Sequence, residues 1–121
     1  MALFGLIGGD KPTPKNIEKQ VSKVKERYAQ PEYRRGAMDR LLEWGTPESL
    51  EAVMQRFTVV AQSPHWDEEE KRWLVDELAQ RGDPARQACV RFLKRENYVA
   101  FAAKALRRLV DEPTYLSDLV E

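Results

Sequence analysis

The chain contains one histidine and one cysteine, residue types that serve as catalytic bases, nucleophiles and metal ligands. His65 follows a Ser-Pro pair, and we expect it in a solvated loop between helices. Cys89 stands between two apolar residues on an apolar stripe, which favours a small core residue over a nucleophile. One residue of each type cannot form a closed zinc site or an intramolecular disulfide. We therefore expect no metal ion.

Carboxylate pairs could act as general acid and base, but the sequence does not arrange them to converge. Asp76 and Glu77 are adjacent on an expected helix, so their side chains diverge by about 100°. The glycines at positions 5, 8 and 9 belong to no strand–helix unit and do not match a phosphate-binding loop. Without a convergent set of titratable groups, we expect no catalytic residue, no cofactor and no enzymatic activity.

The helix expected at 84–95 has a polar half that could bind a charged partner. The surrounding segment 81–110 carries eight Lys or Arg against Asp83 and Glu96. A helical wheel separates the polar side chains from the apolar ones. We predict that these polar residues bind the partner: Arg86, Gln87, Arg91, Lys94 and Arg95. Two alternatives stay open, a solvated face with ion pairs to neighbouring helices and a surface for a phosphate backbone.

Tryptophans are the second group of candidate recognition residues. Trp66 and Trp73 are seven residues apart and could share a helix face, and Trp44 ends another helix. We expect packing in the core or between helix pairs. If exposed in a groove they would be recognition anchors, because Trp and Arg dominate interface energetics. Base stacking beside arginines is a third possibility.

The composition fits one small folded domain. Its 121 residues are 42% hydrophobic, enough for a packed core. Lys plus Arg and Asp plus Glu number 20 each, and this balance argues against binding nucleic acid through overall charge. Residues 2–9 are apolar, but the run stops at Asp10 and is too short to span a membrane. We expect residues 1–13 to form an arm that packs on the first helices or hooks a membrane or partner loosely, and we expect a cytoplasmic protein.

Apolar residues recur at helical spacing, and no strand-like alternation of useful length appears. Thr13-Pro14 opens a helix expected to run to residue 30, with an apolar stripe at Ile17, Val21, Val24 and Tyr28. The remaining helices are expected at 32–44, from 47 to about 60, from about 67 to 78, at 84–95, at 98–110 and after 113. The acidic run 67–70 is interpreted as a helix start, where carboxylates complement the helix dipole. The expected fold class is all-α.

Similar turns separate several of these helices. Gly45-Thr46-Pro47 is matched 37 positions later by Gly82-Asp83-Pro84, and Glu112-Pro113 opens a further helix. Helices joined by so short a turn should lie side by side and antiparallel.

These turns, and the alanine-rich run 99–106, resemble HEAT repeats, most closely the short variety of phycobilisome lyases. The resemblance implies an α-solenoid of about three antiparallel helix pairs at 32–61, 66–95 and 97–121, preceded by a cap helix at 14–30. The second helix of each pair would line the concave side. No motif matches a lyase active site, so no catalytic residue is carried over.

The resemblance implies a protein–protein interaction module or adaptor that docks its partner, for instance an acidic segment, on the concave second-helix face. The alternative is a nucleic-acid-binding module that uses the basic face of 84–95. An enzyme or lyase subunit ranks last. Leu116, Leu119 and Val120 need a cover, so self-association through the C-terminal helix is a further possibility. Stable membrane insertion is not expected.

Overall fold

The computed structural model describes residues 11–95, 105 and 107–109, and every regular element in these ranges is a helix. The prediction of an all-α fold is confirmed for this part of the chain. Residues 1–10 of the arm predicted at 1–13 lie outside the described residues. So do most of the third helix pair predicted at 97–121 and the C-terminal helix through which self-association is a possibility.

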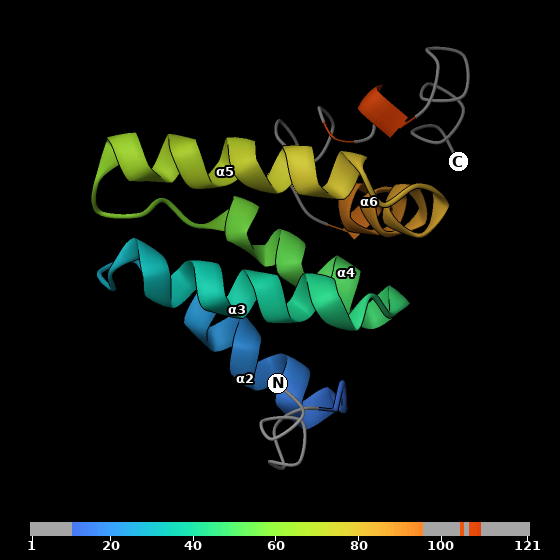
Figure 1. The fold of residues 1–121 in the computed structure, drawn as a ribbon, viewed down its shortest axis with the longest axis horizontal. Coiled ribbons are helices and arrows are strands. Elements are labelled where there is room, and N and C mark those ends of the chain that lie inside the picture. The colour runs from blue at the N-terminus through green and yellow to red at the C-terminus, as the bar shows by residue number, and fades with distance from the viewer. Residues whose placement is uncertain (1–10, 96–104, 106, 110–121) are drawn as a thin grey trace.

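Three rods run back and forth to form the body of the molecule (Figure 1). They are α3 (Pro31–Trp44), the continuous pair α4 (Pro47–Val53) and η2 (Met54–Thr58), and α5 (Pro64–Ala79). α2 (Pro14–Val24) crosses α3 on one side of this body. α6 (Asp83–Arg95) crosses the C-terminal end of α5 and packs chiefly on α4.

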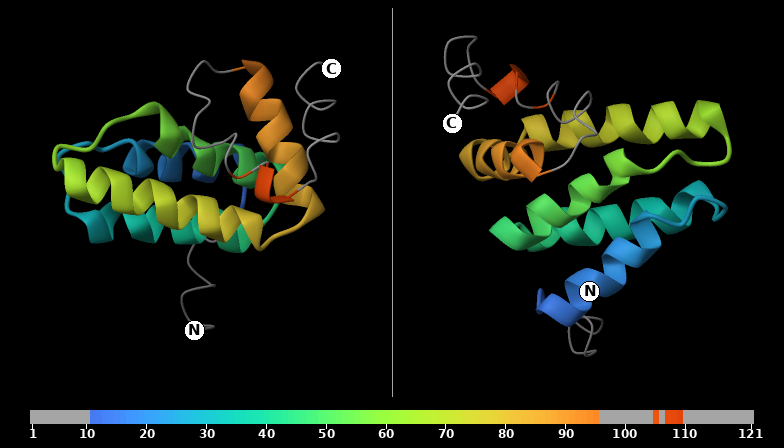
Figure 2. Two further views of the ribbon diagram at one scale, coloured as in Figure 1. Left: turned by 90° about the horizontal axis from the view of Figure 1, so that it is seen from above. Right: turned by 180° about the vertical axis from the view of Figure 1, so that it is seen from behind.

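α5 and α6 are not the side-by-side antiparallel pair expected for residues 66–95. Figure 1 looks nearly down α6 while α5 lies across the view, and Figure 2 shows α6 leaving the end of α5 steeply. Gly82, at φ 74°, makes the sharp turn between them. The apolar stripe of α6 is buried away from α5: the Phe92 ring meets Phe57 of η2 edge-on, with ring centroids 6.4 Å apart.

The first described helix is shorter than expected. Thr13 caps α2 through its side chain and Pro14 is its first residue, as predicted, but the helix ends at Val24 and not at residue 30. The carbonyl groups that follow accept hydrogen bonds from the buried side chain of Arg34 and not from the next helical turn. Tyr28, expected on the apolar stripe, is therefore 67% exposed.

A tight turn connects α3 to the next rod. Gly45 adopts φ 63°, and Thr46 forms a reciprocal capping box with Ser49 at the start of α4. The rod then tightens into the 3-10 helix η2, which ends where the buried Arg56 side chain donates to the Val59 carbonyl at 3.0 Å. The α-helix predicted to run to about residue 60 thus ends at Val53, and Val60, predicted to face inward, is 58% exposed.

α5 begins at Pro64, three residues before its expected start, because Ser63 caps it. His65 is therefore an exposed residue in the first turn of a helix and does not lie in a loop. The core is formed by apolar side chains from all the rods; its largest fully buried members include Met38, Leu41, Leu50, Met54, Leu74, Leu78 and Phe92.

Candidate functional site

The polar half of α6 is partly neutralised by two carboxylates of the chain itself, Asp83 and Glu51. Arg91 donates from Nε to Glu51 of α4 at 2.9 Å, and Arg95 pairs with the other oxygen of the same carboxylate at 2.5 Å. Asp83 accepts from Arg86 at 2.8 Å and from Gln87 at 2.7 Å. The hydrogen bond from Arg86 holds the pKa of Asp83 below its usual value.

Of the five predicted partner-binding residues, only Lys94 forms no such pair among the described residues, and it is exposed. The depression beside Arg86, Gln87, Val90 and Arg91 is shallow, with a volume of about 280 Å³. The arrangement matches the alternative of a solvated face with ion pairs to a neighbouring helix. The predicted residues do lie along one helix, but three of their four cations are already paired, with two carboxylates between them.

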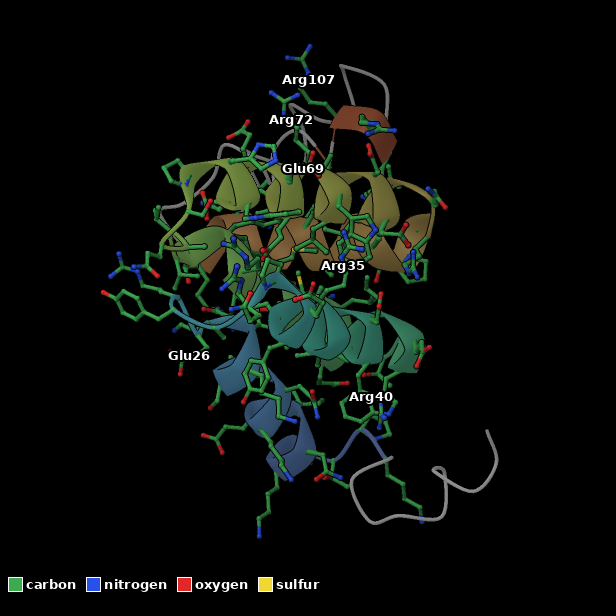
Figure 3. The ribbon with its side chains drawn as sticks, turned by 60° about the vertical axis from the view of Figure 1, so that its left-hand side comes forward. Glu26, Arg35, Arg40, Glu69, Arg72 and Arg107 are labelled. Carbon is green, nitrogen blue, oxygen red and sulfur yellow. The ribbon has the colours of Figure 1, made fainter. Side chains whose placement is uncertain are left out.

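A second basic surface lies where α2 crosses α3, and we call it the α2–α3 groove. It is a depression of about 190 Å³ lined by Gln20, Lys23, Tyr33, Gly36, Ala37 and Arg40. Figure 3 shows Arg40 on α3 near this crossing. Its polar side chains all carry hydrogen-bond donors, and none of the lining residues is acidic.

Two features shape the α2–α3 groove. Gly36 leaves open space, since a Cβ atom there would meet nothing within 4 Å. The ammonium of Lys23 lies 5.9 Å from the centre of the Tyr33 ring, which is 49% exposed. A carboxylate or phosphate entering the groove would therefore meet a cation and a phenol hydroxyl together.

The positive charge of the groove continues along α2. Residues 11–27 hold six Lys or Arg against Glu18 and Glu26, a surplus of four. Lys15, Lys19 and Lys23 are spaced by four residues and so share one face of the helix. Among the described residues none of these three forms an ion pair, in contrast to the arginines of α6. The four-residue spacing of these lysines is a signal that the sequence alone contains.

A buried ionic network lies at the opposite side of α3. Both terminal oxygens of Glu70 accept from Arg34, at 2.7 Å each, and one of them also accepts from Arg56 at 3.1 Å. Asp67 accepts from Arg56 at 2.9 Å and from Lys71 at 2.9 Å. The side chains of Arg34, Arg56 and Glu70 are no more than 3% exposed.

The network fixes two connecting segments to the body. Arg34 donates from Nη1 to the carbonyls of Glu26, Arg27 and Ala29 in the turn before α3. Asp67 accepts from the Ala61 amide at 2.8 Å in the segment before α5. Burial raises the pKa of Asp67, but the hydrogen bonds from Lys71, the Ala61 amide and Arg56 outweigh burial and leave the pKa below its usual value. The role of the network is structural, because its polar groups satisfy one another.

Both fixed segments meet at one end of the molecule, where apolar side chains are exposed. The two segments are joined directly, since the Arg27 carbonyl accepts from the Gln62 amide and Arg27 donates to the Val60 carbonyl. Trp66, in the first turn of α5, is 45% exposed at this end.

Trp66 borders a depression of about 170 Å³ between α3 and α5, which we call the Trp66 pocket. It is lined by Pro31, Glu32, Arg35, Trp66, Glu69 and Glu70. Figure 3 shows Arg35 between α3 and α5. The guanidinium of Arg35 stacks 3.8 Å from the centre of the Trp73 ring, and its buried Nε has no hydrogen-bond partner among the described residues. Trp73 and Trp44 are partly buried against the core, so Trp66 is the most accessible of the three tryptophans.

The remaining sequence candidates show no convergent chemistry. Burial raises the pKa of the Cys89 thiol to about 12, which keeps it protonated at neutral pH. Asp76 pairs with Arg108 and Glu77 with Arg81, so the two carboxylates face different partners. In the described ranges no group of His, Cys, Asp or Glu is placed to hold a metal ion, and no helix is long and apolar enough to cross a bilayer.

Comparison of the chain with protein-family models, with curated proteins and with solved structures gives no match. Its function must therefore be argued from its own surfaces.

Proposed function

We propose that the chain is a small helical protein-interaction module that docks an acidic segment of a partner protein in the α2–α3 groove. The observation that carries the proposal is the absence of ion pairs, within the described residues, for the lysines that line and extend this groove. Docking then adds attraction to charges that form no ion pair within the described residues, which favours both a fast encounter and a specific orientation.

The face of α6 is a weaker candidate for the same role. A partner carboxylate that approached Arg91 or Arg95 would have to compete with Glu51, which is 13% exposed and holds both of them. For the same reason a nucleic acid would release few counterions on binding there. We therefore move the proposed docking site from the second-helix face to the helices that precede it.

As to architecture, we propose a short HEAT-like solenoid in a distorted form. Two observations support it. Gly45 and Gly82 both adopt a left-handed conformation before a helix that carries proline in its first turn, which matches the repeated turn. In addition α3 contacts α5 and α4 contacts α6, as successive first and second helices would. The steep crossing of α5 and α6 is the distortion.

The test is a binding titration with a fluorescent acidic peptide, comparing the variants Lys23→Glu and Lys94→Glu. Both replace a helical lysine and change the net charge equally. We expect Lys23→Glu to weaken binding by about tenfold or more, corresponding to about 1.4 kcal/mol, and Lys94→Glu to change it by less than about twofold. Circular dichroism should show the same helical content for both.

Two results would contradict the proposal. Equal losses in both variants would mean that the peptide senses only the total charge of the protein. Tighter binding of duplex DNA than of the acidic peptide at the same salt concentration would instead identify a phosphate backbone as the ligand.

A further inference from the structure

The Trp66 pocket has the size of a site for one side chain. Its volume of about 170 Å³ lies below the range of about 300–1,000 Å³ that is usual for pockets holding a small-molecule ligand. Pro31 and the exposed face of Trp66 give it apolar walls. Because both helix ends are fixed by the buried ionic network, the pocket is formed before any ligand arrives, which limits the ordering cost of binding.

The rim of the pocket carries two carboxylates with no partner in the described part of the chain. Glu32 and Glu69 are both exposed, and neither forms an ion pair there. The neighbouring Glu68 differs, because Arg72 binds it at 3.1 Å. Glu70, at the base of the pocket, is neutralised by Arg34 and Arg56. The charge open to a ligand is therefore negative.

Two positive contributions at this end oppose that negative charge. The first turns of α3 and α5 lie at this end, but each contains its own acid, Glu32 and Asp67, to complement the helix dipole. Glu69 lies beyond the first turn of α5, so the dipole does not account for it. The second contribution is Arg35, which lines the pocket, but its guanidinium is held against the Trp73 ring.

We infer that the Trp66 pocket binds an arginine side chain from a partner protein. A planar guanidinium can stack on the exposed indole and donate to both rim carboxylates, which a lysine ammonium does less well. The chain itself contains the same pairing next to the pocket, where Arg35 stacks on Trp73. This site is opposite in charge to the α2–α3 groove, and it lies against α5 and not α2, so the two inferences are independent.

The test follows the indole N–H signal of Trp66 by NMR during titration with a short peptide whose only charged side chain is one arginine. The control peptide carries citrulline, which keeps the shape and removes the charge. We expect a saturable shift of the Trp66 signal with the arginine peptide and an affinity at least about tenfold lower for the citrulline peptide. The variant Trp66→Phe assigns the signal.

Charge variants complete the test. Glu69→Gln should weaken binding of the arginine peptide severalfold, whereas Glu48→Gln, an exposed acid in the first turn of α4, should leave it unchanged. Lys23→Glu should also leave it unchanged, which separates this site from the α2–α3 groove.

Four outcomes would overturn the inference. These are the absence of a saturable shift, equal affinity for the citrulline peptide, a Trp66 shift caused by an acidic peptide, and a Trp66 shift that depends on protein concentration alone. The last result would assign the pocket to a second copy of the chain.

Discussion

At the scale of single residues, Arg34 explains most of the irregular backbone. Its guanidinium holds Glu70 on one side and three main-chain carbonyls on the other, with its side chain 2% exposed. Hydrogen bonds to Glu70 raise the pKa of Arg34, so the guanidinium stays charged in the buried site at any ordinary pH. Removing it would leave the Glu70 carboxylate with Arg56 alone and the turn carbonyls without donors.

We expect Arg34→Met to lower the free energy of unfolding by about 3–5 kcal/mol, because this is the usual cost of removing one partner of a buried ion pair. Urea denaturation measures this change in the free energy of unfolding. The matched control is Arg72→Met, which removes an exposed pair with Glu68 and should cost less than about 1 kcal/mol. Similar losses in the two variants would mean that the network does not stabilise the fold.

Cys89 provides a second prediction at this scale. Because its thiol is buried and its pKa is raised to about 12, we expect almost no reaction with a thiol reagent at pH 8 while the chain is folded. In denaturant the reaction should become fast, with a rate set by exposure. A rapid reaction of the native protein would contradict the burial of this side chain.

At the scale of elements, the turns are the parts that the sequence encodes most directly. Thr13, Gly45 and Thr46 act within a few residues of their own position, so their types alone predict where helices begin and end. The early end of α2, by contrast, depends on contacts between residues far apart in the chain. α2 ends early because Arg34 binds its following turn, and Arg34 is in turn held by Glu70, 36 residues away.

The same limit applies to the candidate sites. The helical wheel placed the polar side chains of α6 on one face, but it could not show that Glu51 of another helix neutralises two of them, 40 residues away in the case of Arg91. Opposite charges on otherwise apolar faces, as at Arg34 and Glu70, were the available signal for the network. The acidic run 67–70 was interpreted as a helix start, which is correct for Asp67 but incomplete for Glu70, because Glu70 faces inward.

Two glycines give a matched prediction at the scale of elements. Gly36 lies inside α3 with open space beside it, so Gly36→Ala should raise the free energy of unfolding by about 0.5–1 kcal/mol. Gly45 has φ 63°, so Gly45→Ala should lower it by about 1–2 kcal/mol. Thermal or urea denaturation measures both changes. A stabilising Gly45→Ala would contradict the left-handed turn before α4, and a destabilising Gly36→Ala would contradict the open space beside Gly36.

At the scale of the whole molecule, the buried network joins segments that the apolar core alone would not align. Three cations and two carboxylates from α3, η2 and α5 meet in it, and both connecting segments at that end are bound to it. The opposite side of α3, where α2 crosses, has basic residues that remain open to solvent. The molecule therefore separates charges that maintain the fold from charges available for binding.

This arrangement predicts sensitivity to acid. The pKa of Asp67 is lower in the folded protein than in the unfolded chain, so its contribution is fully present above the unfolded value near 3.8 and is lost as pH falls through the folded value. We expect the urea midpoint to fall as the pH drops from about 4 through the folded pKa of Asp67. In Asp67→Asn the midpoint should be lower at pH 7 and its fall on acidification smaller. An equal fall in both proteins would exclude Asp67 as the source.

The hydrogen bonds that Arg34 makes to the turn before α3 go to main-chain carbonyls, which every amino acid supplies. The path of that turn is consequently indifferent to the identity of the exposed side chains at positions 25 and 28. Evolution or an engineer could exchange those side chains and change what this tip of the protein recognises without redesigning the scaffold beneath it.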